Sequence, residues 1–187
     1  MQVNTSSWTS IEDGIVTAYK TICTAKPILS YQNGVEPQYP YCFINLIKSS
    51  PIGQQSEHLI TNTITREVQL TQDFEATVKF QFVGKDKQVT TVVDTAQNIA
   101  EAFTMKLRTA QARLAFADNA LSVMRIGELK RIPKVKESDI FNVYTVDVII
   151  GYTQYITTVY DTIDSVEMTG TFTENTTGDL IINIDLP

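Results

Sequence analysis

The chain has 187 residues, of which 43% are hydrophobic and 19% are charged, and its formal net charge is −6. This length predicts one domain, 1–187, with an ordinary core, and a mean hydropathy of −0.06 excludes both a membrane protein and a disordered chain. The opening residues lack the basic and then apolar pattern of a signal peptide, and we interpret Cys23 and Cys42 as small buried hydrophobes, so the sequence favours a protein made and used in a cytoplasm.

The first predicted element is a helix that Pro27 closes. Ser10 is its expected N-cap, because Asp13 follows three positions later in a weak form of the capping box. One apolar stripe recurs at helical spacing: Trp8, Ile11, Ile15, Ala18, Tyr19 and Ile22. Residues 31–40, with an Asn-Gly pair and two prolines, predict turns before a near-continuously apolar strand over 41–48.

Residues 61–82, TNTITREVQLTQDFEATVKFQF, alternate between a mostly apolar even-numbered set and a polar odd-numbered set. This is the period of a β-strand with one buried face. Such a strand would run about 70 Å, whereas a compact chain of this length has a diameter of roughly 40 Å. The strand therefore either bends sharply or leaves the body of the protein as an arm.

The polar stretch 49–58, SSPIGQQSEH, contains Pro51 and Gly53 and predicts a loop. With the strands on either side it predicts a hairpin that projects near 41–72 and has 49–58 at its tip. We expect a bend or bulge at Gln72 and Asp73, and from about Phe74 onward the second strand lies in the body.

Residues 84–87 close this strand, and a helix is predicted from about Thr91, with a break near Arg108 that divides it in two. Its expected buried stripe is Val92, Ala96, Ile99, Ala100, Phe103, Leu107, Ala110 and Leu114. A short strand over 121–127 leads to a long strand over 141–160, in which Gly151 is suited to a bulge. The expected inner face of the long strand is Val146, Val148, Ile150, Tyr152, Ile156 and Tyr160. Strands over 163–172 and 180–186, with a turn at 175–178, complete the pattern.

This order of elements predicts an α+β fold. Strands joined by short turns pair antiparallel, and the helices are segregated from the strands, which argues against a doubly wound sheet. We therefore expect a mostly antiparallel sheet with long strands and a projecting hairpin, packed by an N-terminal helix and a central helix or helix pair.

Candidate catalytic residues are few. His58 is the single histidine, next to Glu57 in the predicted tip, and we interpret it as a solvated loop residue rather than a ligand or a base. Asp161 and Asp164 form a carboxylate pair at a turn without a partner base, so we interpret them as solvated turn residues. The sequence shows no nucleophile elbow, phosphate-binding loop or dinucleotide fingerprint, and it indicates no catalytic residue, metal ligand or cofactor.

Charge is unevenly distributed along the chain. Residues 104–136 contain eight basic and two acidic side chains, whereas 137–187 contain nine acidic side chains and no Lys or Arg. The basic segment is open to three interpretations: a solvated face, a contact with an acidic strand of a neighbouring copy, or a nucleic-acid site. The acidic chain as a whole, and the lack of interleaved aromatic residues beyond Phe116, disfavour the nucleic-acid site. Complementary charge favours the protein contact.

Two runs in the second half of the chain carry a family resemblance: NALSVMRIGELKRIPKVKESDIFNVYTVDVIIGY and TIDSVEMTG. They resemble phage neck and tail-terminator proteins of the tail-completion type, in which a helix pair is followed by a short strand ending in Gly, a loop, a long alternating strand and a strand of the form I-x-S-V-E-x-x-G. The matching residues are Val123, Ile126, Gly127, the strand 144–152, Ile163, Ser165, Val166, Glu167 and Gly170. The upstream runs PYCFINLI and QDFEATVKFQFVGKD are also similar, and the resemblance covers about 10–172.

The resemblance implies a structural role. Such proteins form a ring, usually hexameric, at the head-proximal end of a phage tail, where the ring ends growth of the tail tube and sheath and provides the neck interface for head–tail joining. The implied partners are further copies, tail tube and sheath proteins, and neck or head-completion proteins. DNA would pass through the lumen without specific binding. The implied location is the virion, after assembly in the host cytoplasm, with no role for a membrane or an enzyme activity.

Three sets of residues are the expected assembly contacts under this resemblance. The hairpin tip set is Ser50, Pro51, Ile52, Gly53, Gln54, Gln55, Glu57 and His58. The basic loop set is Arg125, Lys130, Arg131, Lys134 and Lys136, and its acidic counterpart is Asp161, Asp164 and Glu167. The alternatives are a head-closure protein or another tail or baseplate subunit, and, in a different class, a non-viral binding module or an enzyme.

Overall fold

The computed structural model describes residues 4–5, 8–30, 37–61, 66–85, 96–136, 139–160, 173–174 and 180–181. The elements are β1 (Asn4–Thr5), α1 (Trp8–Ile22), β2 (Lys26–Leu29), β3 (Tyr41–Thr61), β4 (Arg66–Lys85), α2 (Ala96–Lys106), α3 (Ala110–Ala117), β5 (Leu121–Ile126), β6 (Lys130–Lys136), β7 (Asp139–Tyr160), β8 (Thr173–Glu174) and β9 (Leu180–Ile181). Helices and mostly antiparallel strands are segregated, which confirms the predicted α+β class. The predicted strand 163–172 lies outside the described residues, and a single domain over 1–187 stays a prediction.

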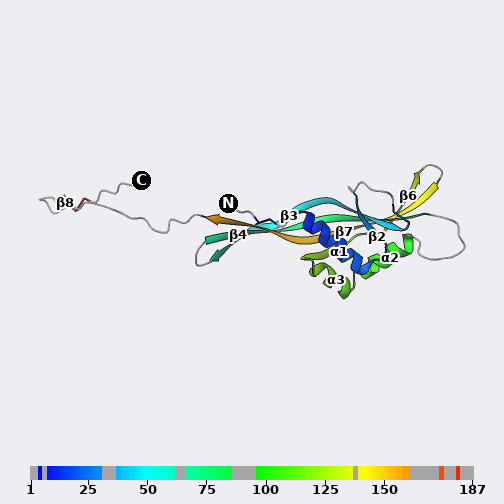
Figure 1. Ribbon diagram of the computed structural model, residues 1–187, viewed down its shortest axis with the longest axis horizontal. Helices are drawn as coiled ribbons and strands as arrows, with labels where there is room; N and C mark the ends of the chain where they lie inside the picture. The colour runs from blue at the N-terminus through cyan, green and yellow to red at the C-terminus, as the bar shows by residue number, and fades with distance from the viewer. Residues whose placement is uncertain are drawn as a thin grey trace.

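Three long strands, β3, β4 and β7, form the centre of a seven-stranded sheet (Figure 1). They contain 21, 20 and 22 residues, as the prediction of long strands requires. β4 lies between β3 and β7 and pairs antiparallel with both, while the outer edge of β7 pairs with β6, β5 and β1 in turn. β2 pairs parallel with β3, and the sequence did not reveal this strand, because Pro27 was interpreted as the end of the first helix. The helix already ends at Ile22, and Pro27 lies within β2.

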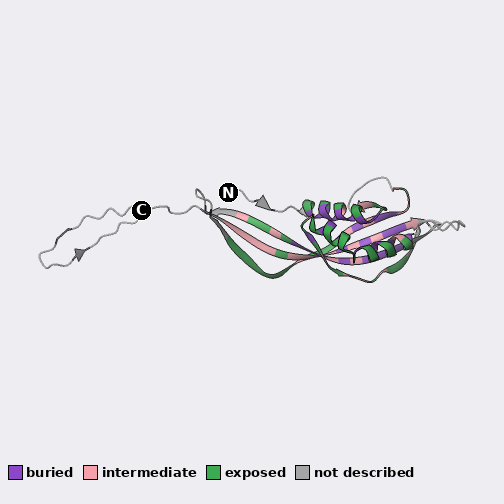
Figure 2. Ribbon diagram, turned by 90° about the horizontal axis from the view of Figure 1, so that it is seen from below, coloured by how far each residue is buried: buried purple, intermediate pink, exposed green. Residues whose placement is uncertain are grey.

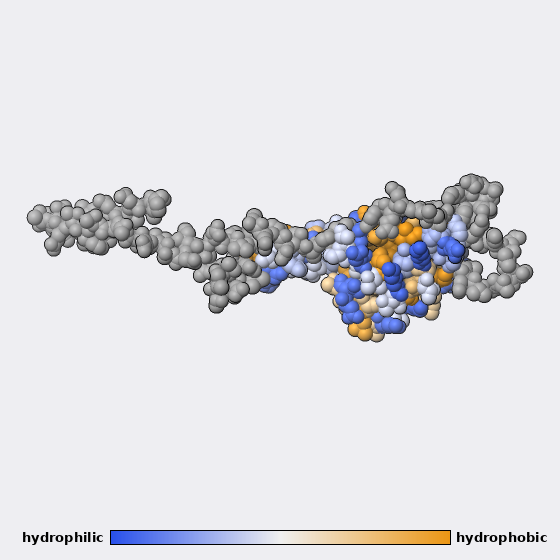
Figure 3. All heavy atoms as spheres, viewed as in Figure 1, coloured by the Kyte–Doolittle hydropathy of each residue, from blue (hydrophilic) through white to orange (hydrophobic). Residues whose placement is uncertain are grey.

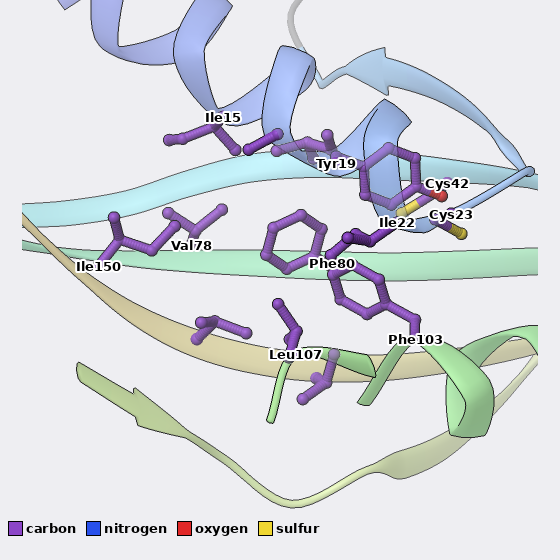
Figure 4. Close-up of a cluster of buried hydrophobic side chains, with 14 of the residues drawn as sticks. Ile15, Tyr19, Ile22, Cys23, Cys42, Val78, Phe80, Phe103, Leu107 and Ile150 are labelled. Carbon is purple, nitrogen blue, oxygen red and sulfur yellow. The ribbon is translucent and has the colours of Figure 1, made fainter. Parts of the chain in front are cut away.

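The core lies between one face of this sheet and the helices (Figure 4). Every second residue of β4 in this region is buried, as the alternation predicted: Ala76, Val78, Phe80 and Phe82. The ring of Phe80 stacks on Tyr19 of α1 at 5.9 Å between centroids and packs against Phe103 of α2 at 4.9 Å. The corresponding residues of β7 are also buried: Val146, Val148, Ile150 and Tyr152.

Two free cysteines lie beside Tyr19 in this core, which confirms their prediction as buried hydrophobes (Figure 4). The Tyr19 hydroxyl is buried and has no hydrogen-bond partner among the described residues. Burial, together with the neighbouring Cys42 and Cys23 thiols, raises the pKa of Tyr19 above its usual range. Burial likewise raises the pKa of the Cys42 thiol, so both groups stay protonated and unreactive near neutral pH.

The predicted helix pair is confirmed, with a break at 107–109, but its second half has a different buried face. Ala110 is exposed and Leu114 is 63% exposed, so the predicted stripe is wrong beyond the break. α3 starts again at its own N-cap, Thr109, and the break shifts the helical phase. It therefore buries a different set: Ala112, Ala115 and Phe116. α1 begins earlier than predicted, at Trp8, which places the expected N-cap Ser10 inside the helix.

The ends of β3, β4 and β7 leave the helical layer and form an arm, defined here as residues 52–61, 66–73 and 153–160 (Figure 1). Buried positions lie in the body beneath the helices, and the arm has half-buried and exposed positions instead (Figure 2). On the face that continues the core, Val68 and Leu70 are half-buried and Ile156 is 39% exposed, so the predicted burial of Ile156 is wrong. The over-long alternating strand thus lies partly in the body and partly in an arm.

Two predicted bulges lie on the neighbouring strands instead. β4 pairs with β7 without interruption through Gln72 and Asp73, and the irregularity is in β3, between Ile52 and Ser56. Gly151 is also in regular pairing with Ser122 of β5, and the irregular β5 stretch, between Val123 and Arg125, lies opposite Ile150 and Ile149. A Cβ atom on Gly151 would lie 2.7 Å from the Ser122 hydroxyl oxygen, so the glycine permits a close approach of β5 rather than a bulge.

Candidate assembly surfaces

The residues predicted as a hairpin tip lie on the outer edge of the sheet. The set Ser50, Pro51, Ile52, Gly53, Gln54, Gln55, Glu57 and His58 belongs to β3, and β3 continues to Thr61, so the prediction of a loop at 49–58 is wrong. The physical reason is that Pro is tolerated on an edge strand and Gly in a bulge, which imitates the composition of a turn. Seven of these eight side chains are exposed and Ser50 is half-buried, so the set is accessible as an edge rather than as a tip.

The bulge in this edge is held by a side chain of the neighbouring strand. Gln72 of β4 donates from Nε2 to the carbonyl oxygen of Ile52 at 2.8 Å, and also to that of Asp73 at 3.1 Å. The next residues of β3 include Gly53, which has a φ of 68°, a left-handed conformation that favours glycine. The bulge is therefore a defined feature of the β3 edge.

The residues predicted as a basic loop form the opposite rim of the sheet. Lys130, Arg131, Lys134 and Lys136 belong to β6, which pairs with the first part of β7, so the loop prediction is wrong and Pro133 is again an edge-strand proline. Arg125 lies on β5, beside the next part of β7. The side chains of Arg125, Lys130 and Arg131 are exposed. We call the set Arg125, Lys130, Arg131, Lys134 and Lys136 the basic rim.

The β6 part of the basic rim and the arm lie far apart along the sheet, whereas Arg125, opposite Ile149 of β7, lies nearly level with Ser50, which is linked through Glu75 to Gly151. Arg131 pairs with Tyr144 of β7, whereas Glu57 is linked through Leu70 of β4 to Ile156 of β7. Twelve residues of extended β7 separate these positions, which corresponds to about 40 Å. Figure 1 shows β6 at one end of the main sheet and the arm at the other. The acidic counterpart, Asp161, Asp164 and Glu167, lies outside the described residues.

A groove of about 560 Å³ lies where the arm joins the body. Phe74 and Tyr152 stack in it with ring centroids 5.5 Å apart, and the Tyr152 hydroxyl lies 2.6 Å from the hydroxyl oxygen of Ser49. Thr153 donates a hydrogen bond to Asp73 at 2.7 Å on its polar side. No sequence signal points to this groove, because strands far apart in the chain bring its residues together.

The helical layer has apolar side chains on its outer surface as well. Met105 of α2 is 71% exposed, beside a groove of about 440 Å³ that also includes Arg108 and Leu129. With the exposed Leu114 of α3, these side chains give the helical layer hydrophobic surface, and hydrophobic atoms are visible on this part of the molecule in Figure 3. The shift in helical phase after α2 is the reason that the sequence assigned Leu114 to the core.

The described residues contain no group of three or more His, Cys, Asp or Glu side chains placed to hold a metal ion. His58 is exposed on β3. Within the same described ranges, no helix is both long enough and apolar enough to cross a membrane.

Comparison with known proteins identifies the family. A family model described as phage neck terminator protein matches residues 8–176, which is most of the chain and includes the central sheet, the arm and the helices. No curated protein matches the sequence. The chain therefore belongs to the phage neck terminator protein family, and its role is that of a structural protein of the phage neck or tail.

Proposed function

We propose that the chain assembles head-to-tail into a closed hexameric ring at the head-proximal end of a phage tail. The ring ends growth of the tail tube and sheath and provides the neck interface for head–tail joining. The supporting observation is the position of β6, which contains four of the five residues of the basic rim, and of the arm at opposite ends of one elongated sheet. A contact between two different surfaces of the same subunit is heterologous, and heterologous contacts generate rings when the rotation between subunits closes.

Charge complementarity supports a specific pairing within this ring. The basic rim would meet the acidic residues Asp161, Asp164 and Glu167, which follow directly after the arm of a neighbouring subunit. The exposed residues of β3 from Ile52 to His58 would contribute a second contact, because they lie on the same arm. Each subunit would thus present its arm to the basic rim of the next.

The other expected partners follow from this location in the virion. Tail tube and sheath proteins would bind one face of the ring and neck or head-completion proteins the other, after assembly in the host cytoplasm. A net charge of −6 suits a lumen through which DNA moves without binding, since like charges repel. This arrangement requires that the basic rim face a neighbouring subunit and not the lumen. We assign the chain no catalytic activity and no cofactor.

The test is the mass of the purified protein in solution. Six copies of the 20.9 kDa chain form a particle of about 125 kDa, which sedimentation velocity and native mass spectrometry distinguish from a monomer. Lys130→Glu with Arg131→Glu should weaken assembly, more at low salt than at high salt, because exposed charges are screened by ions. Lys20→Glu with Arg113→Glu makes the same change of charge on the exposed helices and is the matched control. Equal assembly of both variants at low and high salt would remove the basic rim from the interface.

A further inference from the structure

The sheet is covered along one long edge and open along the other. β6, β5 and β1 pair with the outer edge of β7 at 139–145, 148–152 and 156–157. β2 covers the outer edge of β3 only from Tyr41 to Ile44, and in the described part of the chain no strand pairs with that edge beyond Ile44. An open edge presents backbone donors and acceptors on which a further strand adds.

This edge is only partly protected, since Pro51 removes one backbone donor and the bulge interrupts the ladder, but few of its residues are charged. Open edges in soluble proteins usually have charged side chains that prevent pairing, and β6 on the opposite rim has Lys130 and Arg131. In β3 no charged residue occurs from 49 to 56, and the apolar Ile47 and Ile52 are 47% and 37% exposed. The bulge after Ile52 divides the edge into the regular runs 48–52 and 56–61, so the edge accepts a short strand of five or six residues.

The sequence contains a segment of this length near its C-terminus. Residues 180–186, LIINIDL, have apolar side chains at every even position and mostly polar ones between them, the pattern of a strand with one buried face. Within the described residues, β9 at its start pairs only with β8, in a sheet of two strands that are two residues long. A two-stranded sheet is at best marginally stable alone and gains from joining a larger one. The segment also lies beyond 8–176, so the family match does not assign it a role.

We propose that residues 180–186 of one copy add as a strand to the outer edge of β3 in a neighbouring copy. The proposed ring favours a neighbour over the same chain, because Asp161, Asp164 and Glu167 of the connection would already lie on the basic rim of the next subunit, and the length of the connection permits this reach. β7 ends at Tyr160, at the tip of the arm, and residues 161–179 span up to about 60 Å when extended. The β3 edge of the same arm is only two strand spacings away, about 10 Å. This inference rests on the proposed self-association and names the contact that ties successive subunits together.

Binding of a synthetic peptide tests strand addition directly. The acceptor is the full-length chain with Ile182→Lys and Ile184→Lys, which disables its own segment, and the probe is a fluorescein-labelled peptide of residues 179–187. We expect saturable binding by fluorescence anisotropy. Only one of two sets of backbone N–H groups in the peptide faces the β3 ladder, either 181, 183 and 185 or 182 and 184. A peptide that is N-methylated at the set facing the ladder should bind at least tenfold more weakly than one methylated at the other set. Equal binding of both methylated peptides would overturn strand addition.

Two acceptor variants locate the binding edge. Ile52→Lys places a charge on the β3 edge and should weaken peptide binding at least tenfold, whereas Ile132→Lys makes the same change at a similarly exposed residue of β6 and should leave binding unchanged. Equal effects of the two variants, or no binding of the peptide, would overturn the proposal.

Cysteine pairs decide which chain donates the strand. With Gln55→Cys and Asn183→Cys on separate molecules, we expect a disulfide between copies, and the two native cysteines do not interfere because they are buried. If no disulfide forms when the two single variants are mixed, but a disulfide forms inside molecules that have both substitutions, donation by a neighbour is overturned. If the wild-type chain forms a ring and the Ile182→Lys, Ile184→Lys variant forms the same ring, the inference is wrong and the ring stands. A monomeric wild type that binds the peptide at the β3 edge would instead refute the ring and leave strand addition intact.

Discussion

The division of β4 between body and arm predicts that one substitution has two different effects on the same strand. Val78 and Val68 lie ten residues apart on the same face of β4, but Val78 is fully buried beneath the helices and Val68 is half-buried in the arm. Val78→Ala removes two buried methyl groups, worth about 1.6 kcal/mol in transfer, and leaves a cavity that adds about 1 kcal/mol. We expect the free energy of unfolding to fall by about 2.5 kcal/mol.

Val68→Ala should lower the free energy of unfolding of the monomer by less than about 1 kcal/mol, because the side chain is already partly exposed and only cross-strand contacts are lost. Urea denaturation, followed by far-UV circular dichroism at a concentration where the protein is monomeric, measures both values. The lower stability of Val78→Ala should also lower the melting temperature by about 5–10 °C. Equal losses for the two variants would refute the conclusion that the helices define the body and that the arm lies outside the core.

Two further predictions concern the core and the sheet. Burial raises the pKa of Tyr19 and of Cys42 in the folded protein. The stability that these groups contribute is therefore fully present below their unfolded pKa values, about 10 and 8.5. As pH rises above these values, the free energy of unfolding falls by about 1.4 kcal/mol per pH unit for each group. Urea denaturation between pH 7.5 and 10.5 should therefore show that the free energy of unfolding declines with pH. The decline should be shallower in Cys42→Ala from about pH 8.5 and in Tyr19→Phe from about pH 10. An unchanged slope in both variants would contradict the assignment of this pH dependence to the two buried groups. A Cβ atom on Gly127 would lie 2.8 Å from a carbonyl oxygen of β7, so Gly127→Ala should lower the free energy of unfolding by about 1–3 kcal/mol, whereas a wild-type value would show that the loop before β6 relaxes easily.

The sequence predicted those parts of the fold that local patterns determine. The alternation in 61–82 identified the buried face of β4, and the length of the alternating stretch identified an arm, because a strand that exceeds the diameter of the body must bend or leave it. The helical spacing up to Leu107 identified the face of α2 that contacts the sheet. The resemblance of 119–152 and 162–170 to neck and tail-terminator proteins is confirmed by the family match.

The remaining features depend on pairing between distant segments, which no local pattern reports. Residues 49–58 have the composition of a loop, yet they form a strand because β4 supplies partners for them from Ala76 to Gln69. Lys130 to Lys136 also look like a loop until β7 is placed beside them. The groove at Phe74 and Tyr152 exists only once β3, β4, β5 and β7 are assembled. The sequence thus named the residues of both candidate surfaces and misjudged the structure that presents them.

Electron microscopy of particles assembled without this gene product tests the central claim, that the chain terminates a phage tail and joins it to the head, most directly. The account predicts tails of excessive length, or tails that do not attach to filled heads, with restoration of normal particles when the gene is supplied in trans. Tails of normal length beside heads that lose DNA would contradict tail termination and assign the protein to head closure. Intact and infectious particles would contradict the account as a whole.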